Sequence, residues 1–532
     1  MRIAVGHADT LLGDAAGALA AITAQAQAAH AAGAELLLTP ELAAFGGYPP
    51  RDLLDRPWLV RRQWDALHAA AAAWPLPVAV GAVEPLPGPA PDLANALVLF
   101  AGGRAVAVHR KCKLPANDVF DEPRHFRPGS GGTIARLDDG RRIGLTVCED
   151  LWETSESGRS YAVDPLADLA GRCDVVLNAS ASPYHLGKPA QRRQVVARAA
   201  RRLGCPVVWA NLLGAHDELL FDGGAIRSMP DGRLGESARW SAGIALPDAA
   251  PADPDADADL WRALTFGLAG YCRRTRQERV VLGLSGGIDS AVVACLAVDA
   301  LGPERVIGLL MPGPYSSRGS VVDALDLARA LGIRAHQCSI TRAWEVLLGE
   351  LDGVCGAQPP GDLMQQNLQS RLRGCLVMAA ANQLGAMALT TGNKSELAVG
   401  YCTIYGDMNG GLAPIGDVFK GRVYALARHA NRERERIPAA SLAKPPSAEL
   451  RPDQTDQDNL PPYDVLDRIL AAVIEDGADP GALASEDPAT VAHVMNLVET
   501  SEFKRRQAAP VLRVSRKAFG CGRRMPVARR WG

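Results

Sequence analysis

Residues 283–290 read Gly-Leu-Ser-Gly-Gly-Ile-Asp-Ser, directly after the apolar run 280–282 and directly before a stretch that is typical of a helix. A strand, a tight glycine turn and a helix start in this order leave several backbone N–H groups facing one point, which suits a phosphate. Ser285 and Ser290 add hydroxyl donors, and Asp289 fits beside a phosphate that carries a divalent cation. No Gly-Lys-Ser/Thr sequence closes the loop, so the pattern is not a Walker motif.

The stretch 246–259 alternates proline and aspartate with alanine and keeps no apolar period, so we expect it to be a solvated linker. It separates residues 1–245 from residues 260–532. In the first part, short apolar runs alternate with alanine-rich helical stretches (15–32 and 190–202), which indicates a layered α/β fold; the runs are 3–5, 36–39, 78–83, 96–100, 143–147, 175–178 and 207–210.

In the second part, three expected strands alternate with expected helices, which predicts a doubly wound parallel sheet with ligands at the carboxyl ends of its strands. The strands are 281–284, 306–310 and 387–391, and the helices are 291–301, 320–331 and 371–384.

Composition narrows the class of protein. The 48% hydrophobic and 22% charged residues are typical of a soluble globular protein, and a net charge of -2 argues against a nucleic acid or a membrane as the main partner. The first residues are typical of a strand rather than of a signal peptide, and no apolar run is long enough to cross a membrane, so we expect a cytoplasmic protein.

Eleven cysteines without a Cys-x-x-Cys pair form no disulfide or zinc pattern. We expect most to be buried, Cys173, Cys205 and Cys295 among them.

Three reactive side chains in the first part follow expected strands: Glu41, Lys111 and Cys148. A lone cysteine is usually a buried spacer, and a carboxylate with a lysine is usually a surface ion pair. Parallel strands, however, deliver such side chains to one edge of a sheet. A glutamate there can take a thiol proton, and an ammonium group can favour the thiolate and stabilise a developing oxyanion.

The Glu, Lys, Cys order resembles the nitrilase superfamily of amide-cleaving enzymes, whose fold is a four-layer α-β-β-α sandwich. The Ser-Gly-Gly-x-Asp-Ser loop resembles the pyrophosphate loop of ATP pyrophosphatases, which have an adenine nucleotide α-hydrolase-like fold. With the surrounding strings, the whole chain is similar to the family of glutamine-dependent NAD synthetases. Seven of the eight lysines fall in strings that carry this resemblance; the strings are 40–54, 108–115, 119–122, 178–188, 391–396, 400–407, 414–420, 444–449 and 502–507.

The resemblance implies ATP-dependent amidation of deamido-NAD to NAD through an adenylated intermediate, with ammonia released from glutamine. AMP, pyrophosphate and glutamate are then the other products. In the first part it implies Cys148 as nucleophile, Glu41 as general base, Lys111 as oxyanion stabiliser and Glu122 as a second carboxylate. The residues implied for glutamine binding are Ser182, Lys188, Tyr48 and Trp152.

In the second part the resemblance implies sites for ATP, deamido-NAD and Mg²⁺, with the loop 439–453 as a lid. The ATP residues are Gly283, Leu284, Ser285, Gly286, Gly287, Ile288, Asp289, Ser290 and Thr391. The deamido-NAD residues are Asn367, Glu396, Lys504, Tyr401, Asp407 and Lys420, and the Mg²⁺ ligands are Asp289 and Glu396. It also implies a homo-oligomer formed through the synthetase domains.

Three strings depart from the family pattern: Leu114-Pro115-Ala116-Asn117 where Leu-Pro-Asn-Tyr is expected, an extra glycine between Glu41 and Tyr48, and Gln365-Gln366 in place of a glutamate pair.

Two alternative functions stay open. One is another glutamine-fed, AMP-forming amide ligase of the same loop class. The other is a nucleotide-binding regulator with an inactive amidase domain. An RNA-thiolating enzyme is disfavoured, because neither a cysteine pair nor a basic face is visible.

Overall fold

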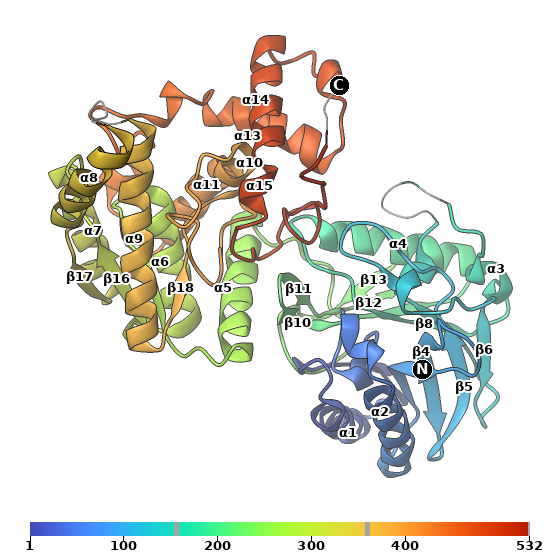
Figure 1. The fold of residues 1–532 in the computed structure, drawn as a ribbon. Coiled ribbons are helices and arrows are strands. Elements are labelled where there is room, and N and C mark those ends of the chain that lie inside the picture. Colours follow the sequence, from blue (N-terminus) through green and yellow to red (C-terminus); the bar gives the residue numbers. More distant parts are fainter. Residues whose placement is uncertain (154–157, 159, 357–361, 530–532) are drawn as a thin grey trace. The chain divides into compact units, whose positions relative to one another are not determined.

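The structure is a computed structural model that describes residues 1–153, 158, 160–356 and 362–529. The chain forms two compact units, Met1–Pro254 and Asp255–Gly532 (Figure 1). Helix α5 (Ala256–Arg274) begins inside the expected linker, so the expectation of irregular chain is wrong for residues 256–259. The Asp255 side chain accepts the N–H groups of Asp257 and Ala258, and this N-cap explains why an aspartate-rich stretch starts a helix.

Unit 1 contains two six-stranded sheets, ordered β14-β1-β2-β3-β4-β5 and β13-β12-β9-β8-β7-β6. The first consists of β14 (Gly243–Ala245), β1 (Ile3–His7), β2 (Leu36–Leu38), β3 (Val78–Pro85), β4 (Leu93–Ala101) and β5 (Arg104–Arg110). The second consists of β13 (Leu234–Glu236), β12 (Ala225–Ser228), β9 (Val207–Asn211), β8 (Val175–Ser180), β7 (Arg142–Val147) and β6 (Thr133–Arg136). A separate hairpin pairs β10 (Leu213–His216) with β11 (Leu219–Asp222).

The two sheets pack face to face, because side chains such as Leu36 and Leu38 of one sheet share a core with Leu145 and Leu177 of the other. Helices cover the outer faces: α1 (Ala15–Ala31) and α2 (Pro57–Ala70) on the first sheet, α3 (Pro165–Leu169) and α4 (Lys188–Leu203) on the second. Figure 1 shows α1 and α2 together on one side of this unit and α4 on the opposite side. The predicted α-β-β-α sandwich is confirmed.

Strand direction explains how distant residues meet in unit 1. Strands β1, β2 and β3 are parallel, and β5 runs in the same direction because the pairs β3–β4 and β4–β5 are both antiparallel. The carboxyl ends of β2 and β5 therefore lie at one edge of the first sheet. In the second sheet β7, β8 and β9 are parallel, so Cys148 and the residues after Ser180 share an edge.

Unit 2 contains a parallel sheet of order β17-β16-β15-β18. Its strands are β17 (Arg334–Gln337), β16 (Val306–Leu310), β15 (Val280–Gly283) and β18 (Met387–Leu389). The crossovers run through α6 (Ile288–Leu301), α7 (Arg318–Leu331), α8 (Thr341–Cys355) and α9 (Leu363–Leu384). This is the predicted doubly wound pattern. The strand order reverses at β15, which places a topological switch point at the glycine loop.

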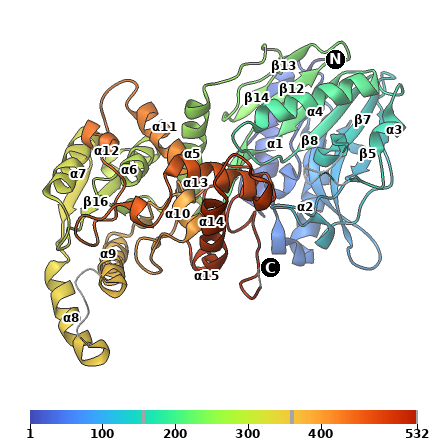
Figure 2. The ribbon, with the colours of Figure 1, turned by 90° about the horizontal axis from the view of Figure 1, so that it is seen from above.

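The remaining helices surround this sheet or build a second core beyond it. They are α10 (Lys394–Val399), α11 (Lys420–Ala430), α12 (Ala439–Ala443), α13 (Tyr463–Leu470), α14 (Pro488–Thr500) and α15 (Glu502–Arg505). The second core includes Leu397, Leu466, Val494 and Phe519. Figure 2 shows α8 extending away from the other helices of this unit. Within the described part of the chain, no helix has the length and apolar character that crossing a membrane requires.

Candidate active sites

Glu41 and Lys111 form a buried ion pair at the edge of the first sheet of unit 1. Glu41 follows β2 and Lys111 follows β5, and both side chains are almost fully excluded from solvent. Nζ of Lys111 donates to Oε1 of Glu41 at 2.8 Å. Asn95 and the N–H of Ala181 also donate to Glu41, at 2.7 Å each. The carboxylate is thus held by three donors, which suits a base that must keep one orientation.

Cys148 lies beside this pair, at a sharp turn after β7. Its φ of 42° is a left-handed backbone conformation, which is uncommon for a residue other than glycine. Burial, and then the neighbouring Glu41 carboxylate, hold the pKa of the Cys148 thiol well above its usual value, while the Lys111 ammonium acts in the opposite direction. Burial and Glu41 therefore outweigh the effect of the Lys111 ammonium, which was expected to favour the thiolate. In the free protein the Cys148 thiol needs a base to remove its proton.

Glu122 joins the same cluster from the loop after β5. Nζ of Lys111 donates to Oε1 of Glu122 at 2.6 Å, while Oε2 of Glu122 is buried without a hydrogen-bond partner. Burial raises the pKa of Glu122 to about 8, even though Lys111 lowers it. Tyr48 is also here: burial, and then the Glu122 carboxylate, raise its pKa. Tyr48 therefore neighbours the cluster despite the extra glycine before it.

The other residues expected to bind glutamine, Ser182, Lys188 and Trp152, lie around the second sheet. Ser182 is buried, and its hydroxyl accepts from Nε of Arg192 at 3.1 Å. Asp222 in turn holds Arg192, with an N–O distance of 2.6 Å. The ammonium of Lys188 lies 4.7 Å from the centre of the Trp152 ring, so these two predicted residues contact each other.

Sequence reasoning missed several members of this site. Asn95, at the start of β4, has no motif around it, and its contact with Glu41 spans 54 positions of sequence. Glu149 and Asp150 directly follow Cys148, and both are buried. The Tyr161 hydroxyl donates to Glu149 at 2.6 Å. The signal that was available for the two acidic residues was their position next to the cysteine.

The glycine loop of unit 2 has the predicted strand–turn–helix form between β15 and α6. Gly286 has a φ of 77°, and a Cβ atom there would lie 2.3 Å from the carbonyl oxygen of Ser320, so only glycine fits. The hydroxyls of Ser285 and Ser290 lie 3.1 Å apart and bond to each other and to loop backbone. The two hydroxyls are therefore bonded within the loop until a ligand replaces these bonds.

The loop faces a cavity of about 300 Å³. Of the residues predicted for ATP, all but Gly286 line this cavity, and Glu396, Tyr401, Asp407 and Lys420 line it among those predicted for deamido-NAD. Asn367 and Lys504 do not line it. Asn367 accepts from the hydroxyl of Thr403, a lining residue, and Lys504 donates to the carbonyl oxygens of Gly400 and Cys402.

Lys420 pairs with both predicted Mg²⁺ ligands. Its Nζ donates to Oδ2 of Asp289 and, at 3.3 Å, to Oε1 of Glu396. Burial raises the pKa of Glu396 to about 8, and the nearby carboxylates of Asp289 and Asp456 push it in the same direction. Three carboxyl groups thus lie near one lysine, and carboxylate oxygens are the ligands that Mg²⁺ prefers.

The segment predicted as a lid, 439–453, lies against the nucleotide loop and the start of α7. The Ser441 hydroxyl donates to the carbonyl of Gly286 at 3.0 Å. Nζ of Lys444 contacts Ser320 at 2.8 Å, and the Glu449 carboxylate accepts from the same hydroxyl at 2.6 Å. Residues 444–450 line the cavity. Lys444, Glu449 and the cavity-lining Arg373 had not been predicted individually.

The glutamine pair that departs from the family pattern lies near the end of this segment, next to Gln454. Gln366 accepts from the side chain of Gln454 at 3.2 Å, and the neighbouring residue Gln365 is buried at the start of α9. Neutral amides therefore stand here, next to a segment that lines the cavity.

Comparison with known proteins agrees with this pairing of an amidohydrolase-like unit and a nucleotide-binding unit. Residues 2–253 match the carbon-nitrogen hydrolase family, and residues 260–508 match the NAD synthase family. A glutamine-dependent NAD(+) synthetase of Synechocystis sp. is 44% identical, with 95% of this chain and 94% of the relative covered. One of Thermotoga maritima is 37% identical, with 100% and 99% covered. This chain belongs to the family of glutamine-dependent NAD(+) synthetases.

Solved structures give the same result for the fold. A glutamine-dependent NAD(+) synthetase from Acinetobacter baumannii, determined with ADP, superposes with a TM-score of 0.77 at 32% identity, covering 99% of this chain and 98% of that one. One from Cytophaga hutchinsonii gives 0.84 at 24% identity, covering 99% and 97%, which supports the fold alone.

Proposed function

We propose that this protein amidates deamido-NAD to NAD, using ATP and ammonia that it releases from glutamine. The observation that carries the proposal is that one chain holds both a buried Glu41–Lys111–Cys148 cluster and a glycine loop that opens on a cavity. A carboxylate is a poor electrophile, so amide formation needs an adenylate, and ammonia near neutral pH is mostly unreactive ammonium. Each site answers one of these two chemical problems.

In unit 1 the Cys148 thiol attacks the side-chain amide of glutamine, and Glu41 takes the thiol proton. Lys111 stabilises the oxyanion of the tetrahedral intermediate. Glu41 then returns the proton to the leaving ammonia, and water hydrolyses the thioester. Ser182, Lys188, Tyr48 and Trp152 hold glutamine, and Glu122 keeps the lysine in place through its 2.6 Å contact.

In unit 2 the nicotinate carboxylate attacks the α-phosphorus of ATP and pyrophosphate leaves toward the loop donors of Ser285 and Ser290. Positioning and charge neutralisation supply most of the acceleration in such transfers. Thr391 contacts ATP, whereas Asn367, Glu396, Tyr401, Asp407, Lys420 and Lys504 make the deamido-NAD site. The segment 439–453 excludes water from the adenylate.

Mg²⁺ accompanies ATP in this proposal. Asp289 and Glu396 offer the hard oxygen ligands that this cation prefers, and both already pair with a cationic group, the Lys420 ammonium. When bound, the cation neutralises phosphate charge. The protein is also proposed to act in the cytoplasm and as a homo-oligomer joined through its synthetase units.

Product analysis tests the proposal. Purified protein with ATP, Mg²⁺, glutamine and deamido-NAD should form AMP, pyrophosphate, glutamate and NAD in equal amounts. Replacing deamido-NAD by other carboxylates separates this function from that of a different glutamine-fed ligase. A regulator with an inactive amidase unit would release no glutamate.

A further inference from the structure

Asp150 is a fully buried carboxylate that the proposed mechanism does not use. Its Oδ1 atom accepts the backbone N–H of Cys112 at 3.0 Å and that of Lys113 at 3.1 Å. These two residues directly follow Lys111, so the carboxylate fixes the chain at the point where the catalytic lysine leaves its strand.

The other oxygen of Asp150 fixes the chain at the nucleophile. Oδ2 accepts the backbone N–H of Val147 at 2.9 Å, and Val147 directly precedes Cys148. Cys148 has the left-handed φ of 42°, a conformation that a residue with a side chain keeps only when its surroundings impose it. One side chain therefore joins the residue before the cysteine to the residues after the lysine.

His109 completes the arrangement from β5. Its Nε2 lies 2.8 Å from Oδ2 of Asp150, and its Nδ1 lies 3.2 Å from the Thr133 hydroxyl. Although burial opposes ionisation, hydrogen bonds from His109 and from backbone N–H groups hold the pKa of Asp150 below its usual value. An ionised carboxylate only accepts hydrogen bonds, so Nε2 of His109 is the donor.

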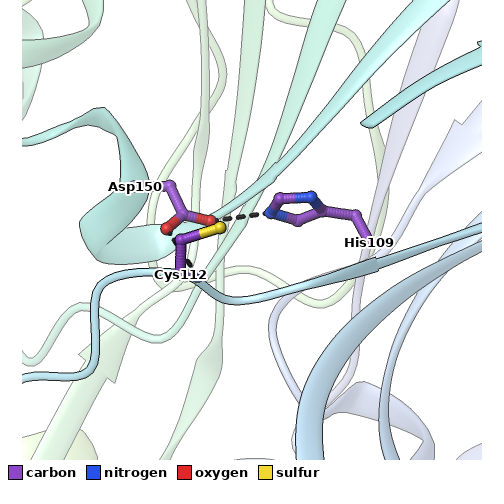
Figure 3. A group of neighbouring side chains, drawn as sticks. All are labelled: His109, Cys112 and Asp150. Carbon is purple, nitrogen blue, oxygen red and sulfur yellow. Dashed lines mark hydrogen bonds and ion pairs between the residues drawn. The ribbon is translucent and has the colours of Figure 1, made fainter. Parts of the chain in front are cut away.

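His109, Cys112 and Asp150 also lie close enough together to be considered as metal ligands (Figure 3). Their bonds argue against this use. Both oxygens of Asp150 are occupied by donors, and Sγ of Cys112 lies 3.5 Å from the carbonyl oxygens of Arg110 and Gly131. The cluster is a hydrogen-bonded support.

We propose that Asp150, oriented by His109, is a positioning residue for the glutaminase reaction, setting the geometry between the Cys148 thiol and the Lys111 ammonium. The inference rests on the proposed function of unit 1. A displacement of about 1 Å between reacting groups can cost on the order of 10²-fold in rate, so a support that ties both chain segments together bears directly on turnover.

Asp150→Asn tests the proposal, because the amide keeps one acceptor oxygen but its NH₂ cannot accept from Val147 or His109. We expect the glutaminase kcat to fall about 10²-fold, with the KM for glutamine changed less than about threefold. The rate of iodoacetamide alkylation of Cys148, measured by mass spectrometry at several pH values, should depend on pH differently in the variant and in the wild type. NAD synthesis driven by ammonium should stay at the wild-type level.

Two controls separate positioning from stability. Asp174→Asn makes the same chemical change at a half-exposed residue that pairs with Arg142, and it should alter nothing. His109→Gln keeps an N–H donor for Asp150 and should lose less kcat than His109→Leu, which keeps none. This pair remains informative if Asp150→Asn does not fold.

The proposal is overturned if Asp150→Asn keeps the wild-type kcat and alkylation profile. It is also overturned if kcat falls only by the same factor as the fraction of protein molecules whose Cys148 can be alkylated. The remaining molecules would then turn over at the wild-type rate. Wild-type protein without glutaminase activity would instead refute the proposed function, and the alkylation profiles would still test the positioning.

Discussion

The two candidate sites handle charge in different ways. In unit 1, Lys111 is buried and bonded to both Glu41 and Glu122, so the charged groups are paired within the protein. In unit 2, Lys420 pairs with carboxylates that line a cavity of about 300 Å³. The difference follows from the proposed substrates. A neutral amide suits a dry, prearranged site, whereas ATP brings its own charge and can replace contacts that the free protein makes internally.

Removal of the nucleophile should give the largest effect and should separate the two sites. Cys148→Ala should lower glutamine-driven NAD formation by at least about 10³-fold, because it removes the thiol that forms the thioester. NAD formation with high ammonium should continue, since unit 2 is untouched. Cys173→Ala, at a buried cysteine in a core of the same unit, is the matched control and should keep both activities. Equal loss with both nitrogen sources in a folded Cys148 variant would contradict the division of labour.

Methionine in place of Lys111 or of Lys420 should show how the two sites differ. The charge of Lys111 is paired inside the protein, whereas a ligand can replace the contacts of Lys420. Lys111→Met leaves Glu41 and Glu122 buried without their cation, and breaking such a pair costs about 3–5 kcal/mol. Lys420→Met should cost less stability, because Asp289 and Glu396 face a cavity that water or a cation can enter. Thermal unfolding of both variants, with and without Mg²⁺, measures this. A larger loss for Lys420→Met would refute the distinction.

The glycine loop offers a smaller change confined to unit 2. Gly286→Ala must strain a left-handed backbone position and meets the Ser320 carbonyl, so we expect about 1–3 kcal/mol of destabilisation. AMP formation should fall similarly with glutamine and with ammonium, while glutamate release from glutamine alone persists. Gly140→Ala also has positive φ, but no atom lies within 4 Å of its added Cβ, so it isolates backbone strain from the clash. Equal destabilisation by Gly286→Ala and Gly140→Ala would mean that the contact with the Ser320 carbonyl adds nothing to the backbone strain.

The fold, and the grouping of residues in the two candidate sites, could be predicted because each depends on a local pattern. Apolar runs marked the strands, and reactive residues directly after them marked the edges where side chains meet, as for Glu41, Lys111 and Cys148. The glycine loop was predicted in the same way, from a strand, a turn and a helix start within a few residues.

Contacts across the sheets could not be predicted, since periodicity says nothing about which distant side chains pair. Asn95 reaches Glu41 from an ordinary antiparallel strand. The string around Lys420 gives no sign of its contact with Asp289, which lies 131 positions away in sequence. The linker prediction failed at 256–259 because one N-cap aspartate outweighed a composition typical of irregular chain.

The smallest expected effect concerns the proton on Glu122. Its pKa is about 8 in the folded protein against an ordinary 4.5, chiefly because of burial, so between these values the folded state holds a proton that the unfolded state has lost. This stabilising contribution is complete below about pH 4.5 and disappears as the pH rises through about 8. Glu122→Gln removes the titration. The free energy of unfolding of the variant minus that of the wild type should therefore rise by about 1–3 kcal/mol between pH 5.5 and pH 8.5, because only the wild type loses this contribution.

The thermal transition of unit 1, measured for both proteins at pH 5.5, 7 and 8.5, checks the size and sign of this change. Glu35→Gln is a useful control that should show no pH-dependent difference in this range. The N–H of Arg2, and then Arg141, lower the pKa of this exposed carboxyl, so its contribution is lost only at pH values below those measured. Parallel pH curves for wild type and Glu122→Gln would mean that Glu122 is ionised throughout this range. The buried cluster would then carry two full negative charges against one lysine, and Lys111 rather than a proton would balance Glu122.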